Sequence, residues 1–170
     1  MKLVGTGVDM PTAKKGVELF DISKLRFDKI IIACDSDIDG KHIESLLLTL
    51  FYKLTPELIK QGHIYILKTP LYEIEYSGQS GKTFAYTDAE MLELTKNKKC
   101  KISRNKGLGE MDAQDFEQCL DPATRRLEKI CLTKDKEASD MFSIFMDEGS
   151  ALRKDYITEH SSEYADIDIE

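Results

Sequence analysis

Residues 29–51 read KIIIACDSDIDGKHIESLLLTLF, an apolar run followed by an acidic turn and then by a different hydrophobic period. The run from Ile30 to Cys34 is continuous and rich in β-branched side chains, which predicts a strand buried on both faces, as in a parallel sheet. From His42 onward the apolar residues follow helical spacing, at Ile43, Leu46, Leu47, Leu50 and Phe51. The acidic turn therefore lies at the carboxyl end of a strand, where α/β folds bind ligands.

The acidic turn resembles the start of a calcium-binding EF-hand loop. Such a loop needs acidic or amide side chains at positions 1, 3 and 5, glycine at 6 and glutamate at 12. Asp35, Asp37, Asp39 and Gly40 satisfy the first four of these requirements, but position 12 is Leu46, which cannot ligate a metal. The turn also follows a strand, whereas an EF-hand loop follows a helix, so we exclude an EF-hand.

Two interpretations of the aspartates stay open on spacing alone. Carboxylates that converge near one point repel one another unless a cation neutralises them, and oxygen ligands of this kind suit Mg²⁺. Alternatively, the turn is a solvated helix start, in which Asp39 acts electrostatically on the helix N-terminus.

The rest of the chain alternates between helical and strand patterns. Pro56 opens and Gly62 follows a short helix, and residues 77–82, SGQSGK, predict a hairpin turn between two strands. Residues 87–90, TDAE, form a capping box that starts a helix through Lys96. Further patterns predict a strand at CKISR, a helix at DAQDFEQCL with Asp112 as its cap, a strand near residue 126 and two terminal helices. This alternation predicts an α/β fold.

Composition narrows the class of protein. Hydrophobic residues make up 41% and charged residues 32% of the chain, and no apolar run reaches the ~20 residues that span a bilayer. The N-terminus lacks the apolar core of a signal peptide, and the four cysteines form no C-x-x-C pair, so we expect a cytoplasmic protein with reduced thiols. The net charge of −7 argues against general nucleic-acid binding, although five acids without any Lys or Arg follow Ile157.

Two long stretches resemble the Toprim domain and C-terminal region of bacterial type IIA topoisomerase B subunits, those of gyrase and its topoisomerase IV counterpart. The first stretch resembles the family pattern D-x-D-x-D-G-x-H-I, followed by P-E-L-I-x-x-G and P-L-Y. The second, NKGLGEMDAQDFEQCLDPATRRLEKI, resembles K-G-L-G-E-M with a later D-P-x-x-R. The matching residues are Asp35, Asp37, Asp39, Gly40, His42, Ile43, Pro56, Gly62, Pro70, Leu71, Tyr72, Lys106 to Met111, Asp121, Pro122, Arg125 and Arg126.

The resemblance implies a Toprim-type, Rossmann-like fold with a parallel central sheet flanked by helices and a C-terminal helical region. It implies that a tyrosine of a partner A subunit attacks double-stranded DNA, in an A2B2 assembly that hydrolyses ATP. By the same resemblance Asp35 and Asp37 are Mg²⁺ ligands, and Asp39 is a ligand or a neighbouring acid. The metal would stabilise charge on the phosphate and the leaving oxygen.

One family feature is not found in this sequence. The family's catalytic glutamate lies in an E-G-D-S-A motif upstream of the aspartates, and the ATPase domain also lies upstream. We therefore expect a fragment that is inactive alone, with no ATP site of its own. The alternatives are a stand-alone Toprim nuclease or primase-like enzyme, and a non-catalytic docking module for the A subunit. The sequence does not separate gyrase from topoisomerase IV.

Four further residues are predicted to contact phosphate or to shape the site. Lys106, beside Gly107 and Gly109, is predicted with Arg104 to contact DNA phosphate, although an exposed lysine in a tight turn gives the same pattern. His42 and Gly40 are predicted to contact phosphate or to stabilise the loop. The expected organisation is an irregular N-terminal part, a Toprim core, C-terminal helices and an acidic, disordered tail, at residues 1–28, 29–132, 133–157 and 158–170.

Overall fold

The computed structural model describes residues 3–9, 16–105, 107–132, 135–147 and 149–164. The chain forms two compact units, Met1–Cys131 and Leu132–Glu170. The first unit begins with irregular chain, in which Val8 makes a bridge with Leu19 and a short 3-10 helix, η1, spans Ile22–Lys24. It then carries two three-stranded sheets, each described below.

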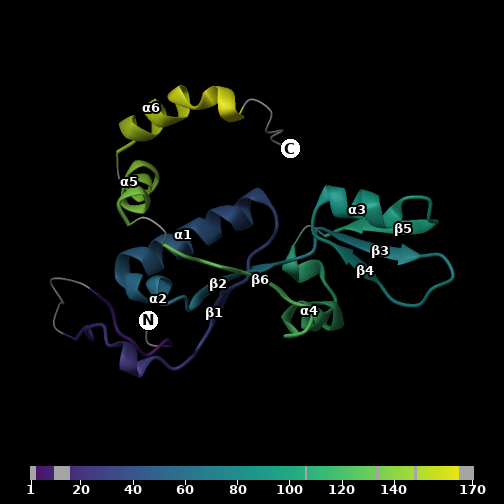
Figure 1. Ribbon diagram of the computed structural model, residues 1–170, viewed down its shortest axis with the longest axis horizontal. Helices are drawn as coiled ribbons and strands as arrows, with labels where there is room; N and C mark the ends of the chain where they lie inside the picture. Colours follow the sequence, from purple (N-terminus) through teal and green to yellow (C-terminus); the bar gives the residue numbers. More distant parts are fainter. Residues whose placement is uncertain (1–2, 10–15, 106, 133–134, 148, 165–170) are drawn as a thin grey trace. The chain divides into compact units, whose positions relative to one another are not determined.

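The first sheet has the strand order β1-β2-β6 and carries the acidic turn at one edge (Figure 1). β1 (Ile30–Ile32) pairs in parallel with β2 (Ile64–Lys68), and β2 pairs antiparallel with β6 (Arg126–Lys129). The sheet is therefore mixed. This confirms the predicted α/β class and corrects the expectation of a parallel central sheet, because only the β1–β2 pair is parallel.

The direction of β6 follows from where the chain enters it. Arg126, the first residue of β6, pairs with Lys68, the last residue of β2. The preceding segment thus ends beside the carboxyl end of β2, and a strand that starts there can only run back along its neighbour. No crossover connection is needed for an antiparallel pair.

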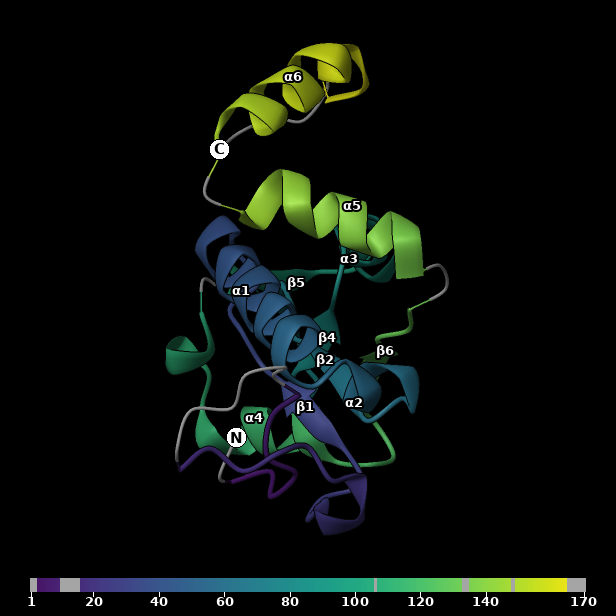
Figure 2. The same ribbon diagram turned by 90° about the vertical axis from the view of Figure 1, so that its left-hand side faces the viewer.

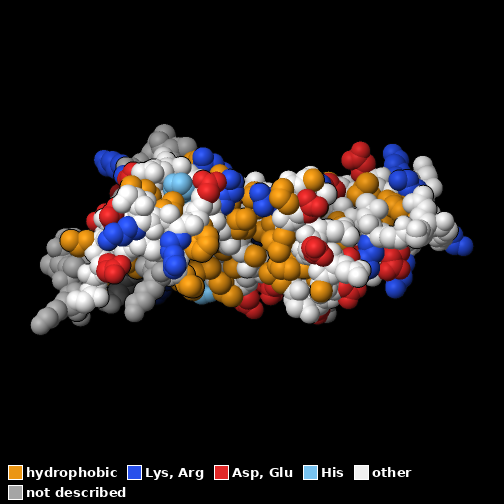
Figure 3. Space-filling view, turned by 90° about the horizontal axis from the view of Figure 1, so that it is seen from below, with side chains coloured by type: hydrophobic (Ala, Val, Ile, Leu, Met, Phe, Trp, Pro, Cys, Tyr) orange, Lys and Arg blue, Asp and Glu red, His pale blue; other side chains and the backbone are white. Residues whose placement is uncertain are grey.

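One side of the first sheet is covered by α1 (Ile38–Leu54) and α2 (Pro56–Lys60) (Figures 1 and 2). Ile64 and Ile66 are buried, whereas Tyr65 between them is only half-buried, as expected when neighbouring side chains point to opposite faces. Figure 3, which views the structure from below, shows hydrophobic side chains gathered at the surface in the middle of this view.

α1 forms where the sequence predicts it, but its apolar face is only partly buried. Phe51 is 7% exposed, whereas Ile43 and Leu46 are 51% and 48% exposed. The buried side of the helix runs through Gly40 and Phe51. Of the stripe expected to face the core, Phe51 is buried, whereas Ile43, Leu46 and Leu50 are exposed.

The second sheet has the order β4-β3-β5, and all its pairs are antiparallel. β3 (Tyr72–Tyr76) and β4 (Thr83–Ala85) form the predicted hairpin, and β5 (Cys100–Arg104) lies on the other side of β3. Helix α3 (Asp88–Thr95) starts at the predicted capping box, where the Glu90 amide donates to Thr87 Oγ1 at 3.1 Å. The Glu90 carboxylate accepts from the Tyr86 amide, one residue earlier than the ideal box.

After the second sheet, η2 (Leu108–Glu110) and α4 (Ala113–Leu120) lead back to β6. The second unit contains α5 (Asp135–Met146), α6 (Ala151–Glu159) and η3 (Ser161–Tyr164), with Phe145 packed edge-to-face on Tyr156. The end of the expected acidic tail, residues 165–170, lies outside the described residues. In the described ranges, none of the helices has the length and apolarity that crossing a bilayer requires.

Candidate functional site

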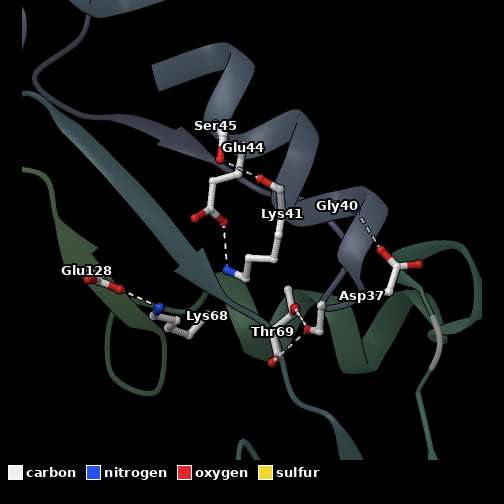
Figure 4. A network of polar contacts seen from close by, with 9 residues as sticks. Asp37, Gly40, Lys41, Glu44, Ser45, Lys68, Thr69 and Glu128 are labelled. Carbon is white, nitrogen blue, oxygen red and sulfur yellow. Dashed lines mark hydrogen bonds and ion pairs between the residues drawn. The ribbon is translucent and has the colours of Figure 1, made fainter. Parts of the chain in front are cut away.

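The candidate site lies where β1 and β2 end side by side. Because these strands are parallel, the turn after β1 and the segment after β2 meet at one edge of the sheet. Ser36 Oγ lies 2.6 Å from Thr69 Oγ1 and holds the two segments together (Figure 4). Ser36 and Thr69 were not singled out by the sequence, since a contact across 33 residues leaves no local pattern.

Asp37 is the N-cap of α1. Its backbone is extended, with φ −82° and ψ −178°, and its Oδ1 accepts a hydrogen bond of 2.7 Å from the Gly40 amide (Figure 4). Asp39 is exposed in the first turn of the same helix, where its negative charge interacts favourably with the helix dipole. The turn thus starts a helix, as the second interpretation expects, and Asp39 lies where its charge can act on the helix N-terminus. The side chain that caps the helix is that of Asp37.

Asp35 is half-buried and connects the two signature stretches. Its Oδ1 accepts a hydrogen bond of 2.7 Å from the Leu108 amide, 73 residues further along the chain. A Cβ on Gly107 would lie 3.1 Å from Asp35 Oδ2, so the glycine allows the loop to approach the carboxylate closely. Ser36, Thr69, Gly107 and Leu108 line one small cavity here.

Gly40 is required by a close approach within the turn. Its ideal Cβ would lie 2.1 Å from the backbone oxygen of Asp35, which is too close for any side chain. The glycine therefore lets the start of α1 fold back over the acidic turn. This supports a loop-stabilising role, one of the two roles expected for this residue.

Contrary to what the sequence led us to expect, the three aspartate side chains do not meet at one point. Across the part of the chain that the structure describes, no group of three or more His, Cys, Asp or Glu side chains is placed to hold a metal ion. Asp35 and Asp37 instead each use one oxygen for a backbone amide. This arrangement still fits Mg²⁺, which keeps several waters and needs only one or two carboxylates besides substrate phosphate. The roles of Asp35, Asp37 and Asp39 as ligands stay predictions.

The remaining predicted site residues are distributed around this edge. His42 is exposed in the first turns of α1, and Arg104 is exposed at the end of β5, opposite Tyr72 of β3. Lys106 lies outside the described residues, although its neighbour Asn105 donates its amide to the Leu71 oxygen at 2.8 Å. The predicted DNA contacts of Arg104 and Lys106 stay predictions.

Lys82 and three acidic residues form a cluster that joins the hairpin to α4, and the sequence analysis did not predict it. Lys82 Nζ lies 2.6 Å from Asp115, 3.0 Å from Glu73 and 3.3 Å from Asp112. These hydrogen bonds, with that to Asp115 the strongest, raise the pKa of Lys82 above its usual value. Asp112 is the N-cap residue of α4, but its side chain makes no capping bond.

Comparisons with known proteins find similarity in two parts of the chain. Residues 1–69 match the model of the Toprim domain, and residues 97–158 match the model of the DNA gyrase B subunit, carboxyl terminus. The chain is 38% identical to the DNA gyrase B subunit of Mycobacterium tuberculosis over 160 residues and to that of Thermotoga maritima over 170. These alignments cover 88% and 98% of this chain but 24% and 25% of the relatives. The chain thus spans about a quarter of the length of these curated relatives.

Proposed function

We propose that this chain is part of a DNA gyrase B subunit, a subunit of the type IIA topoisomerases, and that its aspartates hold Mg²⁺ for cleavage and religation of double-stranded DNA. In this proposal the attacking tyrosine comes from an A subunit, within an A2B2 assembly in the cytoplasm that hydrolyses ATP through another domain. Residues 29–132 form the Toprim core, and residues 133–157 form the C-terminal helices.

The observation that carries the proposal is the hydrogen bond from the Leu108 amide to Asp35. It brings the acidic turn and the loop of Gly107 and Leu108 to the same edge of the sheet. This edge is where α/β folds bind phosphate-containing ligands. A loop with small residues next to carboxylates leaves room for a DNA backbone to approach.

The residues of the site would have distinct tasks. Asp37 fixes the start of α1 and presents a carboxylate to solvent, while Asp35 holds the loop of Gly107 and Leu108 in place. Bound Mg²⁺ would supply charge stabilisation for the phosphate and the leaving oxygen. Arg104 and Lys106 would contact the phosphates of the same DNA duplex.

The structure sharpens the choice of test. Asp37→Ala would remove both the charge and the helix cap, whereas Asp37→Asn keeps an oxygen that can accept from the Gly40 amide. We expect Asp37→Asn, in the full-length B chain assembled with the A subunit, to abolish DNA cleavage with Mg²⁺ while ATP hydrolysis persists. Undiminished cleavage would overturn the ligand role of Asp37.

A second candidate function is a docking module for the A subunit without a catalytic role. It is favoured by the finding that no three-ligand group is assembled among the described residues. Such a module predicts that Asp37→Asn leaves cleavage unchanged while removal of the chain abolishes assembly. A stand-alone nuclease predicts instead that the isolated chain nicks supercoiled DNA with Mg²⁺.

A further inference from the structure

A cavity of about 350 Å³ opens beside the acidic turn, on the side facing β2 and β6. Its wall contains the three basic residues Lys41, Lys68 and Arg126. It also contains the hydroxyl groups of Ser36, Thr69 and Thr87. None of the three basic residues belongs to the set predicted from the sequence to contact DNA.

The fold brings these cations together from three separate elements. Lys68 ends β2, and Arg126 begins β6 directly opposite it in the antiparallel register. Lys41 lies in the first turns of α1, which starts at the neighbouring end of β1. Figure 4 shows Lys41 and Lys68 with their carboxylate partners Glu44 and Glu128. The same edge topology that places the aspartates therefore also places a basic wall next to them.

Lys41 and Lys68 each form an ion pair with a carboxylate. Lys41 Nζ lies 2.9 Å from Glu44, and Lys68 pairs with Glu128. The side chains of Lys41 and Lys68 are 52% and 44% exposed, and ion pairs of this kind contribute only about 0–1 kcal/mol. The Lys68–Glu128 pair is exposed on both sides, so replacing Glu128 by a phosphate oxygen costs little. The Glu44 side chain is only 14% exposed, so Lys41 reaches a phosphate more favourably if it keeps its contact with Glu44.

Arg126 has two contacts that fix its side chain. Its guanidinium stacks 3.9 Å above the ring centre of Tyr86, and its Nη1 lies 2.6 Å from Glu90. The stacking holds the planar donor fork in a fixed orientation, which favours recognition of a phosphate by paired N–H groups.

The lining of the cavity contains more cations than carboxylates. Asp35 and Glu44 line it with the three cations, whereas Glu90 and Glu128, the partners of Arg126 and Lys68, do not line it. Asp35 is moreover engaged by the Leu108 amide, and Glu44 by Lys41. The hydroxyl groups of Ser36 and Thr69 can turn to donate hydrogen bonds to an anion.

We propose that this cavity binds a backbone phosphodiester of a DNA strand, next to the phosphate at the aspartates. The assignment rests on the proposed function, because DNA is the polyanion that function brings to this edge. Lys41 and Lys68 act as point charges, and Arg126 supplies directional hydrogen bonds. The cavity thus sets the path of the strand beside the site.

The test uses the full chain and a fluorescein-labelled 20-base-pair duplex, with EDTA present so that metal binding does not contribute. Fluorescence anisotropy at several salt concentrations gives the slope of log K against log salt. The triple variant Lys41→Gln, Lys68→Gln, Arg126→Gln is expected to weaken binding and to lower the slope by about 1, the loss of one phosphate contact. Lys68→Gln alone, at an exposed residue, is expected to weaken binding without disturbing the fold.

The matched control is Lys24→Gln, an exposed lysine near Asp21 that does not line the cavity. It is expected to keep the wild-type slope. An unchanged slope in the triple variant overturns the proposal, as does a wild-type chain that binds no duplex. Displacement of the duplex by inorganic phosphate at matched ionic strength also overturns it, because the cavity would then take an isolated phosphate.

These outcomes are separate from those of the proposed function. The binding measurement contains no metal and leaves all aspartates intact, so its failure does not affect the test of Asp37→Asn. Conversely, full cleavage by Asp37→Asn overturns the proposed function while the salt slopes still report on the cavity.

Discussion

The carboxylate of Asp35 accepts a hydrogen bond from the backbone amide of Leu108, so that the acidic turn holds the loop of Gly107 and Leu108 in place. The bond is 2.7 Å long and spans 73 residues of sequence. An aspartate that resembles a metal ligand thus also has a structural role. Substitutions at this position must therefore separate the loss of charge from the loss of the bond.

Asp35→Ala is expected to destabilise the chain, because the Leu108 amide loses its acceptor. Hydrogen bonds to charged groups contribute about 1.5–3 kcal/mol, and at this half-buried residue we expect a loss of about 1–2 kcal/mol. Asp35→Asn keeps an acceptor oxygen and is expected to lose less. Urea unfolding in EDTA, followed by circular dichroism, measures both variants.

The same two variants are expected to behave alike toward metal. Both remove the carboxylate that we propose as a metal ligand, so both should weaken Mn²⁺ binding, measured by electron paramagnetic resonance. Glu93→Ala, at an exposed acid on α3, serves as the control and should change neither property. Equal stability of Asp35→Ala and wild type would refute a structural role of the bond.

Gly40→Ala is expected to lower the unfolding free energy, although alanine normally favours a helix over glycine. Its Cβ would lie 2.1 Å from the Asp35 backbone oxygen, and backbone atoms cannot move aside as a flexible side chain can. We expect a loss of about 1–3 kcal/mol, typical of overpacking. Gly109→Ala is the matched control, because its Cβ would meet no heavy atom within 4 Å.

Urea unfolding of the two glycine variants provides the comparison. If Gly40→Ala is as stable as Gly109→Ala, the backbone does not fold over the turn as closely as described. Nuclear magnetic resonance shifts of the residues around Asp35 would report the same rearrangement independently.

Lys82→Met is expected to destabilise the attachment of the hairpin to α4. Asp115 is only 7% exposed and would lose its charged donor, and an unsatisfied buried group costs about 1–3 kcal/mol. Since the pKa of Lys82 is raised above 10.5, its stabilising effect is present at neutral pH and is lost only as pH rises through the folded value. Urea unfolding at neutral pH, with Lys96→Met as an exposed control, measures the effect.

A result in which Lys82→Met and Lys96→Met unfold at the same urea concentration would show that the cluster contributes nothing net. The double variant Lys82→Met, Asp115→Asn gives a further check. It should recover part of the loss, because Asp115 then no longer carries a buried charge without its cation, whereas Glu73 still does.

Local patterns predicted most helices and strands, because their signals lie within a few residues. The capping box at Thr87 and the hairpin turn before Thr83 need no information from the rest of the chain. In contrast, the β2–β6 pairing and the bond between Asp35 and Leu108 join distant segments. A single sequence carries no local signal for either.

The candidate site was predicted in position but not in arrangement. Spacing placed Asp35, Asp37 and Asp39 between a strand and a helix. Asp35 and Asp37 lie between β1 and α1, and Asp39 lies in the first turn of α1. Spacing did not predict that Asp37 caps α1, or that Asp35 accepts a bond from a remote loop. Apolar spacing likewise predicted the helix but not which of its sides is buried, because burial depends on the sheet beneath it.

Glu90 is expected to make the chain sensitive to acid. The hydrogen bond from Arg126, and next that from the Tyr86 amide, hold the pKa of Glu90 below its usual value of 4.5. The unfolded state therefore binds a proton at higher pH than the folded state does. The stabilisation is present above pH 4.5 and is lost as pH falls through the lower folded value.

Glu90→Gln should weaken this dependence, because the amide does not titrate. We expect the urea midpoint of wild type to fall more steeply between about pH 5 and pH 3 than that of Glu90→Gln. Glu93→Gln, on the same helix and exposed, should retain the steep wild-type fall. Parallel curves for wild type and Glu90→Gln would mean that the contact with Arg126 does not stabilise the folded chain. Because Arg126 also lines the basic cavity, bound DNA should draw it from Glu90 and reduce the same acid sensitivity.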